Sequence, residues 1–331
     1  MGFEWNRKKV VVTGAGGFIG SHLVEELCRL GADVTAMIHY NALGSWGNLA
    51  FAEPELREQM KVVAGDIQDS ESVCATLEGA DIVFHLAALI AIPFSYMAPR
   101  SYIRTNIEGT LNILEAVRKG VAGKMVHTST SEVYGTALRE PIDEEHPLQG
   151  QSPYSATKIA ADKLAESYWR SFNVDVVTVR PFNTFGPRQS ARAFIPTIIM
   201  QALTREKIEL GALDPQRDMT YVGDTVKGFI AAAASDGLAG ETLNLGTGNT
   251  ASVGDFARRI TTLMGVDKPL VLDHRRVRPE KSEVLKLVSD NRKAAGLMGW
   301  SPTTDIDDGL RCSIEFITKH VDLYRSTDYV V

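Results

Sequence analysis

Residues 9–20 of the chain read KVVVTGAGGFIG, and this stretch decides the fold. The β-branched run KVVVT predicts a strand, and the apolar spacing that follows the stretch predicts a helix. Gly14, Gly17 and Gly20 stand between the two. A strand, a glycine turn and a helix in this order are typical of a dinucleotide-binding unit, where the turn brings the backbone close to a pyrophosphate. The alternative is a glycine-rich turn that binds nothing.

The alternation of strand and helix continues along the first half of the chain. It predicts an α/β fold with a doubly wound parallel sheet, the Rossmann arrangement. After Arg180 the rhythm breaks into short strands and helices, which predict a smaller mixed α/β C-terminal lobe. The predicted domains are residues 1–180, which bind the dinucleotide, and residues 181–331, mainly the substrate lobe, from which some later strands and helices return to the sheet. The predicted strands are Lys9–Thr13, Asp33–Tyr40, Met60–Ala64, Asp81–Leu86, Lys124–Thr128 and Val174–Arg180.

Composition excludes several other classes of protein. The formal net charge of −6 argues against a general nucleic-acid surface. No apolar run approaches the ~20 residues of a membrane span, and the N-terminus lacks the form of a signal peptide, so we expect a cytoplasmic protein. The 3 cysteines are scattered without metal-ligand spacing, so we expect reduced thiols and no metal site.

A second stretch begins HTSTSEVYG, ends QSPYSATK and carries groups suited to catalysis. Tyr154 and Lys158 are four residues apart, so both side chains leave the same face of a helix. Thr130, Ser131 and Glu132 follow a predicted strand. A phenol, an ammonium, a hydroxyl and a carboxylate beside a nicotinamide would form a hydride-transfer site. Alternatively, Tyr154 and Lys158 are a pair of surface side chains, and Glu132 is a carboxylate exposed to solvent at the end of a strand.

The ends of the second, third and fourth predicted strands indicate which cofactor is held. A dinucleotide fold usually places Asp or Glu at the end of its second strand. This chain has His39 there, which could equally be a solvent-facing residue. No Arg stands there to receive a 2′-phosphate, so we expect NAD. Asp66 and Ile67 could meet the adenine, and the small Ala87 and Ala88 let a cofactor approach the backbone.

Three further polar residues have predicted structural roles. His85 is expected to be a core histidine. Ser70 is expected to be the N-cap of the short helix that ends at Leu77. Asn106 lies inside a long helix predicted over residues 99–119, where a polar side chain that faces the sheet needs a partner.

The motifs TGAGGFIG and Tyr154-x-x-x-Lys158, with Thr130 before the latter, resemble those of the extended short-chain dehydrogenase/reductase family of NAD-dependent epimerases and dehydratases. The resemblance covers essentially the whole chain. More narrowly, the chain is similar to nucleotide-sugar 4,6-dehydratases of the legionaminic acid type, which are NAD-dependent and act on a nucleotide-linked N-acetylglucosamine. UDP and GDP both remain open as the nucleotide. The matching segments are STSEVYG, PLQGQSPYSATK, RPFNTFGPRQSARAFIPTII, RDMTYVGDT and RPEKSEV.

The resemblance implies a role for each matching residue. Tyr154 becomes the base that takes the proton of the sugar 4-hydroxyl while hydride leaves C4 for NAD. Lys158 holds the nicotinamide ribose and lowers the pKa of Tyr154, and Thr130 hydrogen-bonds the sugar. Glu132 removes the C5 proton, the 6-hydroxyl leaves as water, and the hydride returns to C6. NAD is regenerated and is therefore expected to be a tightly held prosthetic group.

The remaining implied contacts are with the two ligands. The residues implied along NAD are Gly14, Gly17, Phe18, Ile19, Gly20, His39, Asp66, Ile67, Leu86, Ala87, Ala88, Tyr154 and Lys158. Those implied along the nucleotide-diphosphate sugar are Ser95, Asn183, Arg192, Arg217 and Arg278, of which Arg217 and Arg278 could also be surface charges.

Ser131 departs from the pattern of the better-known 4,6-dehydratases, which have Asp-Glu where this chain has Ser-Glu. That Asp protonates the departing hydroxyl. Serine is a very weak acid, so it would relay a proton from water, or Glu132 would serve both steps. The Ser-Glu pair also resembles UDP-glucuronate decarboxylases, and a 4-epimerase would need neither carboxyl group. A 4,6-dehydratase is the main prediction, with these two enzymes and a non-enzymatic NAD-binding regulatory protein as alternatives. We also expect a homodimer that pairs the helices beginning near Pro99 and Ser152.

Overall fold

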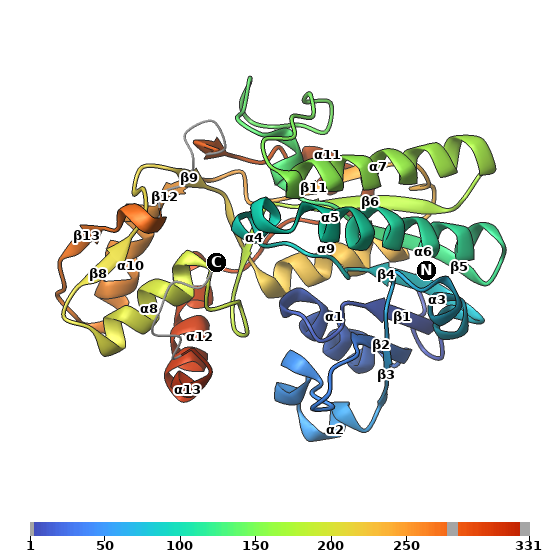
Figure 1. Cartoon of the computed structure of the whole chain (residues 1–331), viewed down its shortest axis with the longest axis horizontal. Helices are drawn as coiled ribbons and strands as arrows, with labels where there is room; N and C mark the ends of the chain where they lie inside the picture. Colours follow the sequence, from blue (N-terminus) through green and yellow to red (C-terminus); the bar gives the residue numbers. More distant parts are fainter. Residues whose placement is uncertain (1–2, 277–283, 325–331) are drawn as a thin grey trace.

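The computed structural model describes residues 3–276 and 284–324, and a seven-stranded parallel sheet forms its larger part (Figure 1). The strand order is β11-β6-β5-β4-β1-β2-β3, with every neighbouring pair parallel. The order reverses between β1 and β4, which is where a doubly wound sheet binds its ligand. The predicted fold class is confirmed. The strands are β1 (Lys9–Thr13), β2 (Asp33–His39), β3 (Met60–Gly65), β4 (Ala80–His85), β5 (Ala122–Thr128), β6 (Val176–Pro181) and β11 (Thr242–Leu245).

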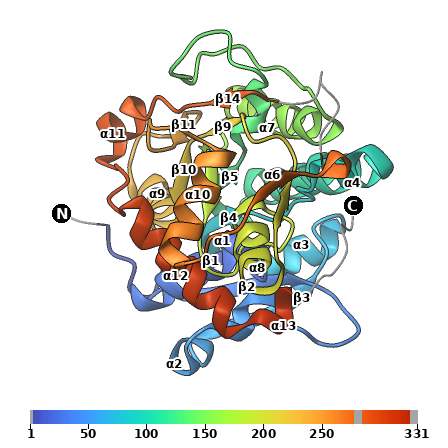
Figure 2. The ribbon, with the colours of Figure 1, turned by 90° about the vertical axis from the view of Figure 1, so that its left-hand side faces the viewer.

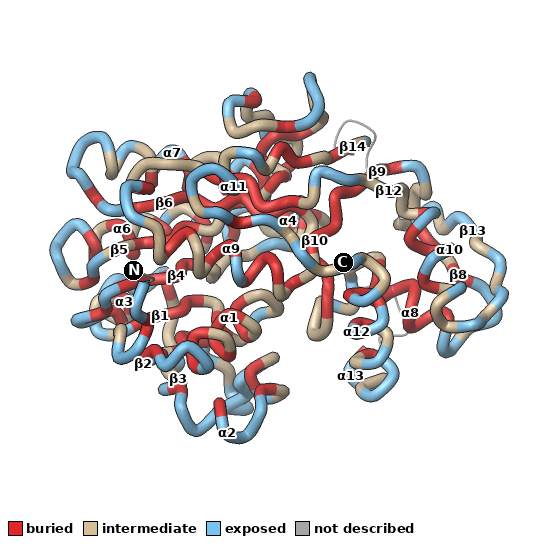
Figure 3. The backbone as a smooth tube through the Cα atoms, turned by 180° about the vertical axis from the view of Figure 1, so that it is seen from behind, coloured by how far each residue is buried: buried red, intermediate tan, exposed pale blue. Residues whose placement is uncertain are grey.

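Both faces of the sheet are buried, which explains why its strands are nearly continuous apolar runs (Figure 3). Successive side chains of β1 point to opposite faces. Val10 and Val12 pack in the same core cluster as Phe229 of α9, while Val11 packs with Ile113 of α6. Helices α1 (Phe18–Arg29) and α9 (Val222–Ala234) cover one face, and α3 (Ser70–Leu77), α6 (Gly109–Arg118) and α7 (Pro153–Phe172) cover the other.

The second half of the chain builds the smaller lobe but also returns to the sheet. After β6, the chain enters the lobe, comes back as α9 and β11, and then leaves again (Figures 1 and 2). The helices of the lobe are α8 (Phe194–Thr204), α10 (Val253–Met264), α12 (Ile306–Lys319) and α13 (Val321–Tyr324). Its short strands are β7 (Asn183–Phe185), β8 (Ile208–Leu210), β9 (Gln216–Arg217), β10 (Met219–Tyr221), β12 (Ala251–Ser252), β13 (Leu270–Leu272) and β14 (Lys286–Leu287).

Two helix predictions change in detail. The N-cap of α3 is Asp69, whose carboxylate accepts hydrogen bonds from the backbone N–H groups of Glu71 and Ser72, so the prediction of Ser70 was wrong. The long helix predicted over residues 99–119 is helical throughout, but it contains a π-helical segment between α5 (Pro99–Tyr102) and α6. The remaining helical elements are η1 (Gly47–Phe51), α2 (Pro54–Arg57), α4 (Ile92–Met97), η2 (Ile103–Glu108, the π-helix), η3 (Ser131–Tyr134), η4 (His274–Arg276) and α11 (Arg292–Met298).

Candidate active site

The glycine turn lies between β1 and α1 and packs directly against the chain that leaves β4. Gly14 has φ of +69°, and a Cβ atom there would lie 2.7 Å from the backbone N of Ala87. A Cβ at Gly20 would overlap the carbonyl oxygen of Gly14. Thr13 holds the contact in place, because its Oγ1 accepts a hydrogen bond of 3.2 Å from the N–H of Ala87. Glycine is therefore required at Gly14 by both conformation and space.

The start of α1 fits a bound pyrophosphate. The N-cap is Gly17, which has no side chain to satisfy the first N–H groups of the helix, and Phe18 and Ile19 begin the first turn. Such free N–H groups at the positive end of a helix bind phosphate oxygens. Asn48 donates its backbone N–H to the carbonyl of Gly16 at 2.9 Å, so the segment after β2 folds over the turn. The described residues thus provide a place for a dinucleotide.

The adenosine end of the predicted cofactor site is built differently from the common pattern. His39 ends β2 as an exposed residue. The carboxylate of Asp66 accepts the N–H of Gln68 at 2.9 Å, and the side chain of Ile67 is buried against Gly109. Leu86 packs at the edge of the core beside Ala87 and Ala88, all three half-buried in the segment after β4.

Helix α7 presents Tyr154 and Lys158, as the spacing predicts. Ser152 is its N-cap and forms a reciprocal capping box with Ser155, which fixes where the helix begins. Lys158 is buried, and its Nζ donates to the carbonyl of Thr128 at the end of β5, 2.6 Å away. The ring of Tyr154 packs edge-on against Tyr102, with 6.3 Å between ring centroids. Both side chains therefore lie at the carboxyl end of the sheet.

Burial shifts the pKa values of this pair toward neutral forms. Burial raises the pKa of the Tyr154 phenol, the hydrogen bond with Thr130 acts to lower it, and the charge of Glu132 raises it further. Burial lowers the pKa of Lys158 to about 8, against the opposing charge of Asp162. The lowered pKa predicted for Tyr154 is therefore not produced by the groups of the protein alone.

Thr130, Ser131 and Glu132 form the turn that faces Tyr154. Thr130 is the N-cap of η3, and its Oγ1 accepts the backbone N–H of Glu132 at 3.2 Å. The Thr130 hydroxyl hydrogen-bonds the phenol of Tyr154, and the charge of Glu132 acts on the same phenol. Ser131 is 2% exposed.

Asn106 finds its partners, as the sequence predicts, within the π-helix. Its Oδ1 accepts the N–H of Leu89 at 2.9 Å, and its Nδ2 donates to the carbonyl of Leu89 at 3.0 Å and to Oγ1 of Thr157 at 3.1 Å. The side chain thus joins the loop after β4 to the turn of α7 between Tyr154 and Lys158. π-Helical turns are frequent at functional sites. His85 is a buried core histidine with Thr13 and Thr110 as partners, which confirms that prediction.

The residues predicted to bind the substrate differ in burial and in hydrogen-bond partners. Asn183 on β7 has a buried Oδ1 without a hydrogen-bond partner among the described residues. Arg192 is exposed, and its charge acts to lower the pKa of the Tyr102 phenol. Arg217 is buried and donates to the carbonyl of its neighbour Gln216. Ser95 is fully buried and donates to the carbonyl of Ile92, so its hydroxyl is used within α4. Arg278 lies outside the described residues.

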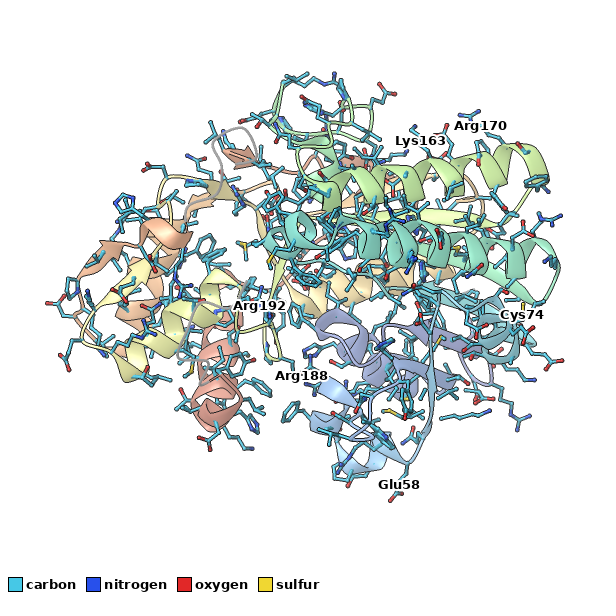
Figure 4. All side chains as sticks on the ribbon, viewed as in Figure 1. Glu58, Cys74, Lys163, Arg170, Arg188 and Arg192 are labelled. Carbon is cyan, nitrogen blue, oxygen red and sulfur yellow. The ribbon has the colours of Figure 1, made fainter. Side chains whose placement is uncertain are left out.

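Figure 4 shows Arg188 and Arg192 in the region where the two lobes meet, while Lys163 and Arg170 lie on the outer side of α7. Arg188 has φ of +69° and pairs with Glu25 of α1 through contacts of 2.6 and 3.1 Å. It also donates to the carbonyl of Phe51 at 3.0 Å. This long-range pair fixes the loop that carries Arg192, and no local pattern in the sequence indicates it.

One buried carboxylate, that of Asp162, is not predicted from the sequence. Asp162 follows Lys158 by four residues, so Tyr-x-x-x-Lys-x-x-x-Asp spacing was the available signal. Asp162 and Arg180 reach the floor of a cavity of about 620 Å³ between α7, the loop at residues 144–148, and β6 and β11. None of the residues predicted to bind cofactor or substrate lines this cavity.

Comparison with known families identifies the class of enzyme. The family described as GDP-mannose 4,6-dehydratase matches residues 11–312. The chain belongs to that family. It lies within the extended short-chain dehydrogenases/reductases, as the sequence motifs predict.

Individual relatives and solved structures support the same family assignment. A dTDP-glucose 4,6-dehydratase of Actinoplanes is 32% identical over 308 residues, which cover 91% of this chain and 95% of the relative. A dTDP-glucose 4,6-dehydratase of Streptomyces venezuelae with NAD bound superposes with a TM-score of 0.86 at 28% identity, covering 97% of this chain and 100% of that chain. A UDP-N-acetylglucosamine 4-epimerase of Methanobrevibacter ruminantium in complex with UDP-N-acetylmuramic acid has a TM-score of 0.86 at 28% identity, covering 95% and 99%.

These similarities make the protein an enzyme of the nucleotide-sugar dehydratase and epimerase family and confirm NAD as its cofactor. Within residues 3–276 and 284–324, helices long and apolar enough for a membrane crossing do not occur.

Proposed function

We propose that the protein is an NAD-dependent nucleotide-sugar 4,6-dehydratase that acts on UDP- or GDP-linked N-acetylglucosamine. The observation that carries the proposal is the Glu132 carboxylate, which lies on the turn that faces Tyr154 and whose charge acts on the phenol. A 4-epimerase removes and replaces a hydride at one carbon and has no use for a second base. A dehydratase must also remove a proton from C5, and a carboxylate next to the first base is suited to that step. The legionaminic-type motifs in the sequence support the same assignment.

The chain's own residues divide the work as follows. Tyr154 accepts the proton of the sugar 4-hydroxyl, and Thr130 orients that hydroxyl from the other side. Lys158 holds a ribose hydroxyl and places a positive charge near the developing phenolate. Glu132 takes the C5 proton, and the 6-hydroxyl leaves as water, with Ser131 or Glu132 delivering its proton. Bound NAD would supply the acceptor and then the donor of the hydride. C5 regains a proton as the hydride returns to C6, and Tyr154 releases the proton that it took from the 4-hydroxyl, so the overall change is the loss of one water.

The two ligands would lie on opposite sides of this group. The glycine turn and the start of α1 hold the pyrophosphate of NAD, and Asp66 with the backbone of Ile67 meets the adenine. Asn183, Arg192 and Arg217 extend from the smaller lobe toward the diphosphate of the sugar nucleotide, where Arg matches phosphate geometry.

The test is incubation of the purified protein with UDP- and GDP-N-acetylglucosamine, followed by mass spectrometry. Loss of one water without net NADH is expected. An unchanged mass with a new stereoisomer would instead identify a 4-epimerase. Loss of carbon dioxide from UDP-glucuronate would identify a decarboxylase, which the Ser131-Glu132 pair also resembles.

A single substitution separates the two bases. Glu132→Gln is expected to retain proton transfer at the 4-hydroxyl and the accompanying rise in NADH absorbance, and to reduce water loss by about 10²–10³-fold. Glu145→Gln, an exposed carboxyl in the same half of the chain, is the control and should dehydrate normally. Normal dehydration by Glu132→Gln would remove the proposed base.

We also infer a cytoplasmic homodimer in which α6 and α7 of each copy pair as four helices. The two helices already pack together on one face of the sheet. Light scattering at micromolar concentration should give twice the chain mass, and a monomer would contradict the inference.

A further inference from the structure

A buried polar cluster near Lys158 takes no part in the reaction as proposed above. Its members are Asp162, Arg180, His127 and Ser129. Asp162 is 5% exposed and Arg180 4% exposed. Asp162 comes four residues after Lys158 on α7, so the two side chains leave the same face of the helix.

The carboxylate of Asp162 is held by four hydrogen bonds. Nε2 of His127 lies 3.1 Å from Oδ1, and Oγ of Ser129 donates to Oδ2 at 2.7 Å. Arg180 donates to Oδ2 from Nε at 3.1 Å and from Nη2 at 2.9 Å. Arg180 is itself fixed by the hydroxyl of Tyr134, which accepts Nη1 at 2.9 Å. The position and charge of this carboxylate are therefore set from β5, β6 and η3 before any ligand binds.

Lys158 and Asp162 reach the same end of β5, because Nζ of Lys158 donates to the carbonyl of Thr128 while Asp162 is bonded by the residues on either side of it, His127 and Ser129. The titratable groups whose charges act on Lys158, or on which it acts, are Asp162 on its own helix, His85 on β4 and His127 on β5. Burial lowers the pKa of both histidines, so both are neutral near pH 7. Tyr154 is on the same helix, and its pKa is raised by burial, so the phenol is neutral as well.

The other neighbouring charges act elsewhere. Arg180 adds a second buried cation to the cluster, and Glu132 acts on Tyr154. Burial by itself disfavours an ammonium, and the pKa of Lys158 is already about 8. Among the described residues, Asp162 is the carboxylate whose charge counters that effect.

We propose that Asp162 is a positioning residue that keeps Lys158 in its ammonium form at neutral pH. The inference rests on the proposed role of Lys158 at the nicotinamide ribose. Without the carboxylate, Lys158 would share the interior with Arg180 and would release its proton. It would then lose both the charge beside Tyr154 and one hydrogen-bond donor.

The test measures the protonation of Lys158 directly, in the absence of substrate. In protein labelled with 15N-lysine, the buried ammonium gives a proton–nitrogen NMR signal, which is assigned by its loss in Lys158→Arg. The wild-type signal is expected to titrate with a midpoint near pH 8. In Asp162→Asn the midpoint is expected to fall by about one to three pH units, the usual effect of removing a nearby opposite charge.

A second variant guards against misfolding. Asp162→Asn leaves Arg180 unpaired, whereas Asp162→Asn/Arg180→Met removes both members of the buried pair and is expected to fold. Its Lys158 midpoint should also fall, because the Asp162 charge is gone, but by less than in Asp162→Asn, because the Arg180 cation is gone too. Glu166→Gln is the matched control, because Glu166 lies one turn further along α7 and pairs with Lys163 and Arg170 at the surface.

An unchanged Lys158 midpoint in either folded variant would overturn the proposal. Since the readout is the charge of a lysine and not turnover, this failure is distinct from failure of the dehydratase assignment. That assignment fails if the wild-type protein removes no water from either sugar nucleotide.

Discussion

The ion pair between Arg188 and Glu25 joins the smaller lobe to the sheet, and breaking it should cost far more than breaking a surface pair. The perturbation is Glu25→Gln, which keeps the shape of the side chain and removes its charge. The two side chains are 9% and 5% exposed, and Arg188 makes contacts of 2.6 and 3.1 Å with the carboxylate. Removing one partner of such a buried pair leaves an uncompensated cation and typically costs about 3–5 kcal/mol.

The same helix offers a matched control in the pair of Arg29 and Glu53. That contact is 3.0 Å long, but its side chains are 43% and 63% exposed. Glu53→Gln should therefore cost under ~1 kcal/mol, because water screens the pair in the native state. The two variants change the same chemical group and differ mainly in burial.

The assay is urea unfolding at pH 7, followed by far-ultraviolet circular dichroism and by tryptophan fluorescence. Glu25→Gln should lower the free energy of unfolding by about 3 kcal/mol more than Glu53→Gln does. Equal effects in the two variants would refute the claim that burial makes the Arg188 pair a structural link between the lobes.

Three further predictions concern the cofactor turn, the catalytic helix and acid stability. Gly14→Ala should reduce the affinity for NAD, measured by calorimetry, by more than about tenfold, because the new Cβ would meet the backbone of Ala87. Gly44→Ala is the control: Gly44 also has a positive φ, +60°, but its Cβ would point into open space, so the affinity for NAD should not change. Ser152→Ala should lower the free energy of unfolding by about 1 kcal/mol, because the capping box of α7 is lost. Ser167→Ala, on the exposed side of α7, should change the free energy of unfolding by under ~0.5 kcal/mol. Equal losses in the two variants would contradict the role of the cap. Burial acts to raise the pKa of Asp162, but His127 and Arg180 outweigh it and bring the pKa to about 2. Since the unfolded value is about 3.9, the stabilising contribution of Asp162, on the order of 2–3 kcal/mol, is present above pH 4 and is lost as the pH falls through 2. The free energy of unfolding of the wild type should therefore drop more steeply between pH 4.5 and 2.5 than that of Asp162→Asn/Arg180→Met, and parallel curves would contradict it.

The sequence predicts the fold well because its signals are local. The period of apolar residues and the glycine turn indicate strands and helices, and most strands of the sheet lie within two residues of their predicted bounds. The N-cap of α3 was misplaced by one residue because Asp69 and Ser70 are both good N-caps and only the backbone conformation distinguishes them.

The proposed catalytic residues are predicted for the same reason, and the groups that pack behind them are not. Tyr154 and Lys158 share one helix, so their spacing fixes their relation. The partners of Asp162 come from β5 and β6, and the register of these strands against α7 is a property of the folded sheet. Glu25 and Arg188 are separated by 163 positions in the chain, and only packing of the two lobes brings them together.

The pairing of β11 with β6 has a consequence for how the protein is made. Thr242–Leu245 forms the edge strand beside Val176–Pro181, so the larger lobe lacks its last strand until three quarters of the chain has been synthesised. During translation, the open edge at β6 and the apolar side chains that α9 covers remain without their partners. A fragment ending near residue 180 would keep this edge permanently, so expressing this part of the larger lobe alone should yield aggregating protein. The two lobes can therefore be exchanged or engineered only as one unit.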